Sequence, residues 1–130
     1  MKIEAGMYVR TKNGLIAKCI SVNNYMEKYV FDDNVSWEYE YYEEVSFDRW
    51  EEFVSENLKK YSFELIDLVE VGDYVNGRKV DDISLIEDVY FVKIKVSNTN
   101  NYDYLPEHLI EDIVTKEQFN LVKYHKKRAE

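Results

Sequence analysis

The sequence contains few of the residues that break, bend or cross-link a chain: one proline, four glycines and one cysteine among 130 residues. The single cysteine, Cys19, excludes an internal disulfide, and its apolar neighbours favour a buried strand residue over a nucleophile. No apolar run resembles a signal peptide or reaches the roughly 18 residues of a membrane helix. We therefore expect a soluble, cytoplasmic protein with no membrane partner.

The sequence also lacks the usual marks of catalysis and of cofactor or metal binding. The two histidines, His108 and His125, form no recognisable nucleophile–base pattern with Cys19. Neither Asp32-Asp33-Asn34 nor Asp81-Asp82 has the spacing of a calcium loop, and glycine-rich phosphate loops are missing. We predict a protein that is not an enzyme and has no catalytic residues, no cofactor and no metal. A small enzyme is the third-ranked alternative.

One short motif occurs twice in the chain. Gly6-Met7-Tyr8-Val9 is matched by Gly72-Asp73-Tyr74-Val75, and a turn glycine follows each copy. A motif that recurs after about half the chain indicates two similar units. We predict that residues 6–20 and 72–83 form equivalent hairpins. Asn76-Gly77 favours a tight two-residue turn in the second of them.

The middle of the chain changes its hydrophobic period. Residues 35–45 alternate, which predicts a strand with one aromatic and one acidic face. From Ser46 onward the apolar residues recur at helical spacing, so residues 46–60 are predicted to form an amphipathic helix. Ser46 is its expected N-cap, and Trp50 lies in the stripe expected to be buried. Lys59-Lys60 is expected to occupy the last turn.

The second half contains further strand and helix signals. Residues 63–69 and 89–96 are predicted to be strands, because both are rich in apolar and β-branched side chains. Thr115-Lys116-Glu117-Gln118 fits a helix capping box. A short helix should therefore begin at Lys116 and pack through Phe119.

Together these patterns predict an α+β fold that is predominantly β: two related small twisted-sheet or SH3-like units with an inserted amphipathic helix. Each half is short for independent folding, so we expect a single compact domain over residues 1–130. Within it, residues 1–34 are the expected first β unit and residues 35–62 an acidic strand–helix insertion. Residues 63–130 are the expected second β unit, with a short C-terminal helix.

The net charge of −9 is concentrated in one part of the chain. Residues 1–31 carry +3, residues 32–73 carry −11 and residues 74–130 carry −1. A field of this sign repels phosphate backbones and attracts basic protein surfaces. We therefore expect no direct nucleic-acid binding and a partner protein with a basic surface.

Eight carboxylates follow the predicted central strand and helix, and we take them as the candidate partner-binding residues: Glu38, Glu40, Glu43, Glu44, Asp48, Glu51, Glu52 and Glu56. Such a row can imitate the phosphates of nucleic acid and occupy a basic groove. The alternative is a solvated face that only keeps the protein soluble. The nearby aromatic residues leave two interpretations open, an aromatic cage for a cation or cross-strand packing. They are Trp37, Tyr39, Tyr41 and Tyr42.

Residues 6–14, 65–77 and 113–119, taken in that order, resemble segments of small uncharacterised proteins of phages and prophages of low-GC Gram-positive bacteria. The acidic and aromatic stretch at residues 37–56 departs from the common pattern, which makes it the expected place of a specialised function. The resemblance implies a phage product that acts inside a bacterial host cell, and it supplies no catalytic residues.

These observations lead to two hypotheses about function. The first is a non-enzymatic phage protein that binds and inhibits a host protein through its acidic surface. The target would be a nucleic-acid-directed defence nuclease such as a CRISPR effector, which would make the protein an anti-CRISPR. The alternative is a phage accessory SH3-like interaction module that recruits a partner protein without inhibiting it. Salt dependence of binding discriminates the two, because only charge mimicry should weaken steeply with salt.

Overall fold

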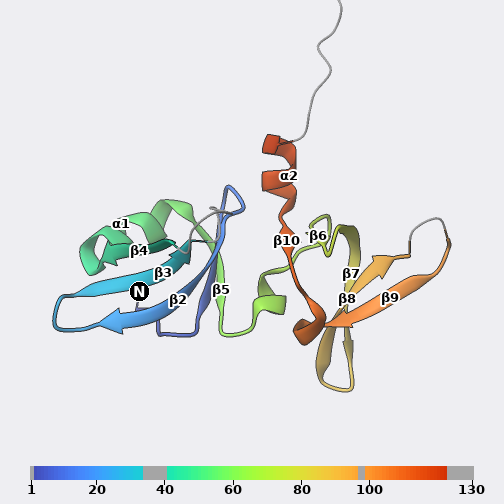
Figure 1. The fold of residues 1–130 in the computed structure, drawn as a ribbon, viewed down its shortest axis with the longest axis horizontal. Coiled ribbons are helices and arrows are strands. Elements are labelled where there is room, and N and C mark those ends of the chain that lie inside the picture. Colours follow the sequence, from blue (N-terminus) through green and yellow to red (C-terminus); the bar gives the residue numbers. More distant parts are fainter. Residues whose placement is uncertain (1, 34–40, 97–98, 123–130) are drawn as a thin grey trace, which may run out of the picture. The chain divides into compact units, whose positions relative to one another are not determined.

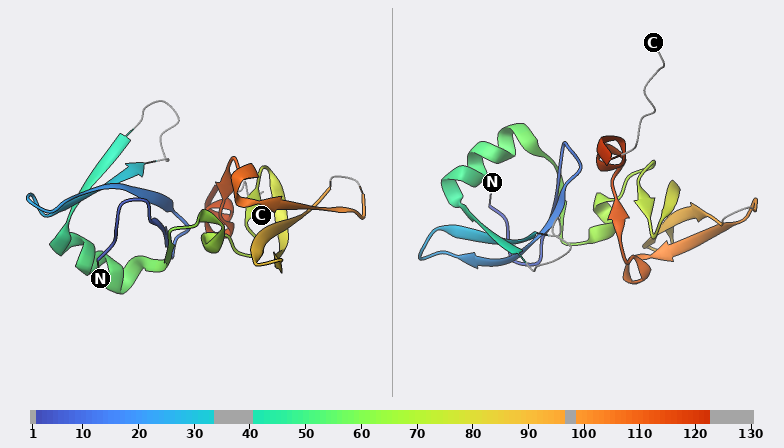
Figure 2. Two further views of the ribbon diagram at one scale, coloured as in Figure 1. Left: turned by 90° about the horizontal axis from the view of Figure 1, so that it is seen from below. Right: turned by 45° about the horizontal axis from the view of Figure 1, so that its top comes forward.

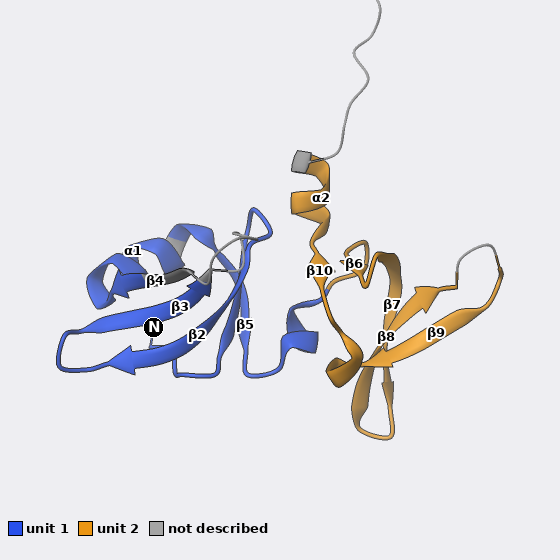
Figure 3. Cartoon of the chain, in the orientation of Figure 1, with its two compact units in different colours: residues 1–69 blue, residues 70–130 orange. Residues whose placement is uncertain are grey.

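The computed structural model describes residues 2–33, 41–96 and 99–122 (Figure 1). The chain divides into two units, Met1–Val69 (unit 1) and Glu70–Glu130 (unit 2), shown in separate colours in Figure 3. Each unit contains one five-stranded antiparallel sheet and little helix. The predicted fold class, a predominantly β α+β protein with two small units, is confirmed.

The sheet of unit 1 has the strand order β4-β3-β2-β1-β5. A helix, α1 (Phe47–Asn57), connects β4 to β5 and lies across the sheet, as both views of Figure 2 show. The strands are β1 (Tyr8–Thr11), β2 (Ile16–Asn23), β3 (Lys28–Asp33), β4 (Tyr41–Ser46) and β5 (Leu58–Ser62). The strand–helix segment expected as an insertion therefore contributes β4 and β5 to the first sheet.

The sheet of unit 2 has the order β10-β6-β7-β8-β9, which is the same order that unit 1 shows from β5 to β4. A 3-10 helix, η2 (Glu107–Leu109), stands between its last two strands, where unit 1 has α1, and α2 (Lys116–Val122) follows. The strands are β6 (Tyr74–Val75), β7 (Arg78–Ile86), β8 (Val89–Lys95), β9 (Tyr102–Pro106) and β10 (Ile113–Val114).

The hairpins that open the two units make matching hydrogen bonds. The amide of Gly6 donates to the carbonyl of Cys19 (2.7 Å), and the amide of Gly72 donates to the carbonyl of Val80 (3.1 Å). Both glycines have a φ of 96°, a conformation that side chains disfavour. A β-bulge follows Cys19 in β2 and Val80 in β7. The predicted equivalence of residues 6–20 and 72–83 is therefore seen in backbone geometry.

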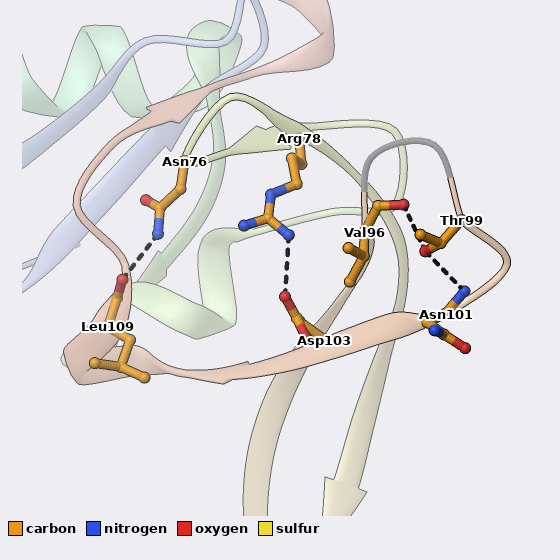
Figure 4. Close-up of polar contacts among 7 residues, drawn as sticks. All are labelled: Asn76, Arg78, Val96, Thr99, Asn101, Asp103 and Leu109. Carbon is orange, nitrogen blue, oxygen red and sulfur yellow. Dashed lines mark hydrogen bonds and ion pairs between the residues drawn. The ribbon is translucent and has the colours of Figure 1, made fainter.

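Local contacts in unit 2 follow the sequence signals closely. Asn76 and Gly77 both have positive φ, as the predicted tight turn requires. The Asn76 side chain donates to the carbonyl of Leu109 (2.9 Å), and Arg78 pairs with Asp103 (3.0 Å), as Figure 4 shows. The turn and one end of the sheet are thereby fixed to the segments that follow.

The short helix α2 begins at Lys116, as predicted. The hydroxyl of Thr115 accepts a hydrogen bond from the amide of Gln118 (3.3 Å). Phe119 stacks on Tyr74 with a centroid distance of 4.4 Å, so the helix packs on its own unit through the expected aromatic residue.

One boundary and one element of the predicted secondary structure are wrong. The helix ends at Asn57, and Lys59-Lys60 lies in β5 because residues 58–62 pair with β1. Residues 63–69 form no strand; they contain a 3-10 helix, η1 (Leu65–Leu68), with Ile66 buried. The strand predicted over 89–96 is confirmed as β8.

Candidate partner-binding surface

Helix α1 carries the candidate surface, and its sequence explains where it begins. Ser46 adopts extended backbone geometry, and its hydroxyl accepts a hydrogen bond from the amide of Arg49 (3.2 Å), as an N-cap does. Asp48 places a negative charge in the first turn, where the helix dipole favours it. The carbonyl of Asn57 accepts from the amide of Lys12 (2.8 Å), which ties the end of the helix to the β1–β2 connection.

The inner face of α1 packs on the sheet through aromatic rings. Trp50 is 3% exposed, which confirms its predicted burial. Its ring lies 5.4 Å from Phe31, 5.6 Å from Phe53 and 6.0 Å from Tyr29, measured between centroids. Its indole nitrogen is buried and has no hydrogen-bond acceptor among the residues that the structure describes. This cluster fixes the rotation of α1, and with it the side that faces solvent.

The outer side of α1 presents exposed carboxylates. We call this set the acidic face, and it consists of Asp48, Glu51, Glu52 and Glu56. Asp48, Glu52 and Glu56 follow one another at four-residue steps, so they form a row along the helix. Glu44 is 63% exposed and pairs with Lys28 at 3.6 Å, but its neighbour Val45 packs on the core under α1, so Glu44 lies on the opposite face of the sheet. The structure thus brings four of the eight predicted site residues to one exposed region of unit 1.

Three further predicted site residues cannot be placed on that face. Glu38 and Glu40 lie outside the described residues. Glu43 belongs to β4, where its backbone pairs with Phe31, and only that backbone is described. Of the aromatic residues considered for a cation cage, Trp37 and Tyr39 lie outside the described residues, and only the backbone of Tyr41 and Tyr42 in β4 is described.

A cavity of about 300 Å³ lies between α1 and the sheet of unit 1. Its walls are apolar and include Val9, Ala17, Phe31, Trp50 and Phe53. Polar side chains occur among the other lining residues: Thr11, Asn13, Asp32, Arg49 and Asn57. Because successive helical residues are about 100° apart, Trp50, Phe53 and Asn57 project to a different side from the Asp48, Glu52 and Glu56 row, whereas Arg49 lies at the edge of that row.

Cys19 is buried and inert in this arrangement. Burial raises the pKa of its thiol above the ordinary value, and a backbone hydrogen bond with Ser21 lowers it by a smaller amount. The thiolate, which is the reactive form, is therefore disfavoured. The expectation of a buried strand cysteine is confirmed.

Metal-binding clusters and membrane-spanning helices are absent from the described part of the chain. Within residues 2–33, 41–96 and 99–122, no group of three or more His, Cys, Asp or Glu side chains could hold a metal ion. None of the described helices is both long enough and apolar enough to cross a membrane. No protein-family model matches the chain, and comparisons with curated proteins and with solved structures gave no match.

Sequence patterns missed the cavity and two buried polar residues. Arg10 is fully buried and donates to the carbonyl of Leu68 (2.8 Å). Asp73 is fully buried and accepts from the amides of Glu70 (2.7 Å) and Lys116 (2.9 Å). Both residues occur in or beside the repeated motif, but only the fold reveals that they are enclosed.

Proposed function

We propose that this protein is a non-enzymatic binding protein that uses the acidic face of unit 1 to occupy a basic surface on a partner. The observation that carries the proposal is the row of exposed carboxylates on a helix whose rotation is fixed by a buried tryptophan. A rigid helix presents charges at fixed spacing, which reduces the entropy lost on binding. A mobile acidic loop would lack that advantage.

The spacing of these charges supports a partner that normally holds nucleic acid. From Asp48 to Glu56 the helix rises about 12 Å and carries four carboxylates, on average one per roughly 4 Å of axis, of which Asp48, Glu52 and Glu56 lie about 6 Å apart in the row. A single nucleic-acid strand carries one phosphate per about 3.4 Å. Arg49 offsets one of the four charges and lies toward the cavity side of the row. The proposed partner is therefore a nucleic-acid-directed nuclease, and the proposed setting is a phage protein acting on such a defence enzyme in the host cytoplasm.

Competition for the partner tests this proposal. Purified host nucleases would be incubated with the immobilised protein at low and high salt, with and without a single-stranded oligonucleotide. Charge mimicry predicts capture that weakens with salt and that the oligonucleotide reverses, because both ligands use one basic groove. Capture that resists both salt and oligonucleotide would contradict the proposal.

A second candidate, an interaction module that recruits a partner without inhibiting it, is favoured by a different observation. The β7–β8 hairpin of unit 2 ends in a turn that is visible in Figure 1. Apolar side chains around that turn are exposed, Leu85 by 58%, Val89 by 49% and Ile86 by 45%. Exposed apolar groups that cluster are typical of interaction sites. Binding through this hairpin should persist at high salt and be lost in a Leu85→Ser, Val89→Ser double variant, whereas binding through the acidic face should survive those substitutions.

A further inference from the structure

The cavity under α1 is open to solvent and has the volume of a small-molecule site. Such sites start at roughly 300 Å³. The cavity has about that volume. Asn13, Leu15 and Arg49 line it and are exposed, so it communicates with solvent. A molecule from solution can therefore reach it.

Aromatic rings form much of the cavity wall. Trp50 lies between Phe31 and Phe53, and all three residues line the cavity. Val9 and Ala17 continue the apolar surface from the sheet side. Walls of this kind stabilise a flat apolar molecule through area burial and ring–ring contacts.

The described lining of the cavity carries no net charge. Asp32 and Arg49 are the charged residues among the described lining, one of each sign. One carboxylate oxygen of Asp32 already accepts a hydrogen bond from the amide of Lys18 (2.6 Å). A ligand with net charge would lose hydration on entering without meeting an excess of the opposite charge. The lining thus selects a neutral ligand.

We propose that this cavity is a binding site for a small neutral aromatic molecule. The ring would lie against Trp50 and Phe53, and a polar substituent would face the amide side chains of Asn13 and Asn57. The site uses no residue of the acidic face, so a test of ligand binding in the cavity is independent of the proposed partner binding.

Titrations followed by nuclear magnetic resonance test the site with three probes of similar size. Benzyl alcohol is neutral, benzoate is anionic and benzylamine is cationic at neutral pH. Benzyl alcohol should shift the indole signal of Trp50 and the methyl signal of Ala17 in a saturable manner. Both charged probes should bind at least about tenfold more weakly, because their desolvation is not compensated. A Trp37→Phe variant assigns the indole signal.

Variants that fill the cavity provide the control. Ala17→Leu should abolish the benzyl alcohol shifts, whereas Ala5→Leu, the same change at an exposed position of unit 1, should leave them unchanged. If Ala17→Leu loses the dispersed spectrum of the folded state, Leu15→Trp at the exposed edge serves in its place. The proposal is overturned if no probe gives saturable shifts at Trp50, if a charged probe binds as tightly as benzyl alcohol, or if the shifts persist in the folded cavity-filling variant.

Discussion

Replacing Trp50 by alanine should strongly destabilise unit 1. The side chain is 3% exposed and packs against three aromatic rings, so its removal should cost about 3–5 kcal/mol. Typical stabilities of 0.05–0.15 kcal/mol per residue correspond to roughly 3–10 kcal/mol for the 69 residues of Met1–Val69. The substitution should therefore remove a large part of the stability of this unit.

Trp50→Phe is the matched control for this experiment. It keeps a six-membered ring in the cluster, and it loses no hydrogen bond to a described residue, because the indole nitrogen has no such acceptor. The expected cost is about 1–2 kcal/mol, from the smaller volume alone. Urea unfolding followed by far-ultraviolet circular dichroism gives both free energies by linear extrapolation. A loss below about 1 kcal/mol for Trp50→Ala, or equal losses for the two variants, would refute the packing argument.

Three further predictions concern the cysteine and the repeated motif. Cys19 should react with a thiol reagent only after the protein unfolds. Because the pKa of its thiol is raised in the folded state, its contribution to the free energy of unfolding should be complete below the thiol pKa of the unfolded state and should be lost as pH rises through the thiol pKa of the folded state. Unfolding curves at alkaline pH would reveal that loss. Gly6→Ala and Gly72→Ala should each lower the free energy of unfolding by about 1–2 kcal/mol. An added Cβ meets only ordinary contacts at both positions, so the cost comes from the shared φ of 96°. Clearly unequal losses of stability in thermal melts would argue against equivalent hairpins. Asp73→Ala should cost about 2–5 kcal/mol by leaving two backbone donors without their acceptor, and denaturation of Asp73→Asn should show a smaller loss.

The sequence predicted those parts of the fold that depend on local signals. The Asn76-Gly77 turn, the Ser46 cap and the buried Trp50 were all evident, because turn geometry, capping and helical periodicity involve neighbouring residues only. The end of α1 was not evident from the sequence, because residues 58–62 become a strand through pairing with β1. Helix propensity could not reveal a partner strand about 50 residues earlier in the chain.

The candidate site was likewise predictable only where it depends on local sequence signals. Exposure of the carboxylates on α1 followed from the periodicity of the helix, with Asp48, Glu52 and Glu56 opposite the buried stripe. The cavity could not be predicted, because residues from four strands and one helix line it and the register of those strands is a property of the whole sheet. Buried Arg10 and Asp73 were missed for a related reason, since nothing in a local pattern distinguishes an enclosed charge from an exposed one.

The association rate with a nucleic-acid-directed nuclease tests the central claim most directly. A Glu51→Lys, Glu52→Lys, Glu56→Lys variant reverses three charges of the acidic face, and a control reverses three exposed acids elsewhere, Glu64, Glu111 and Asp112, to lysine. Both variants should fold, because exposed substitutions usually change stability by less than about 0.5 kcal/mol. The account predicts an association rate that falls by about tenfold or more at low salt for the first variant and changes little for the control. Equal rates for the two variants would contradict binding through the acidic face.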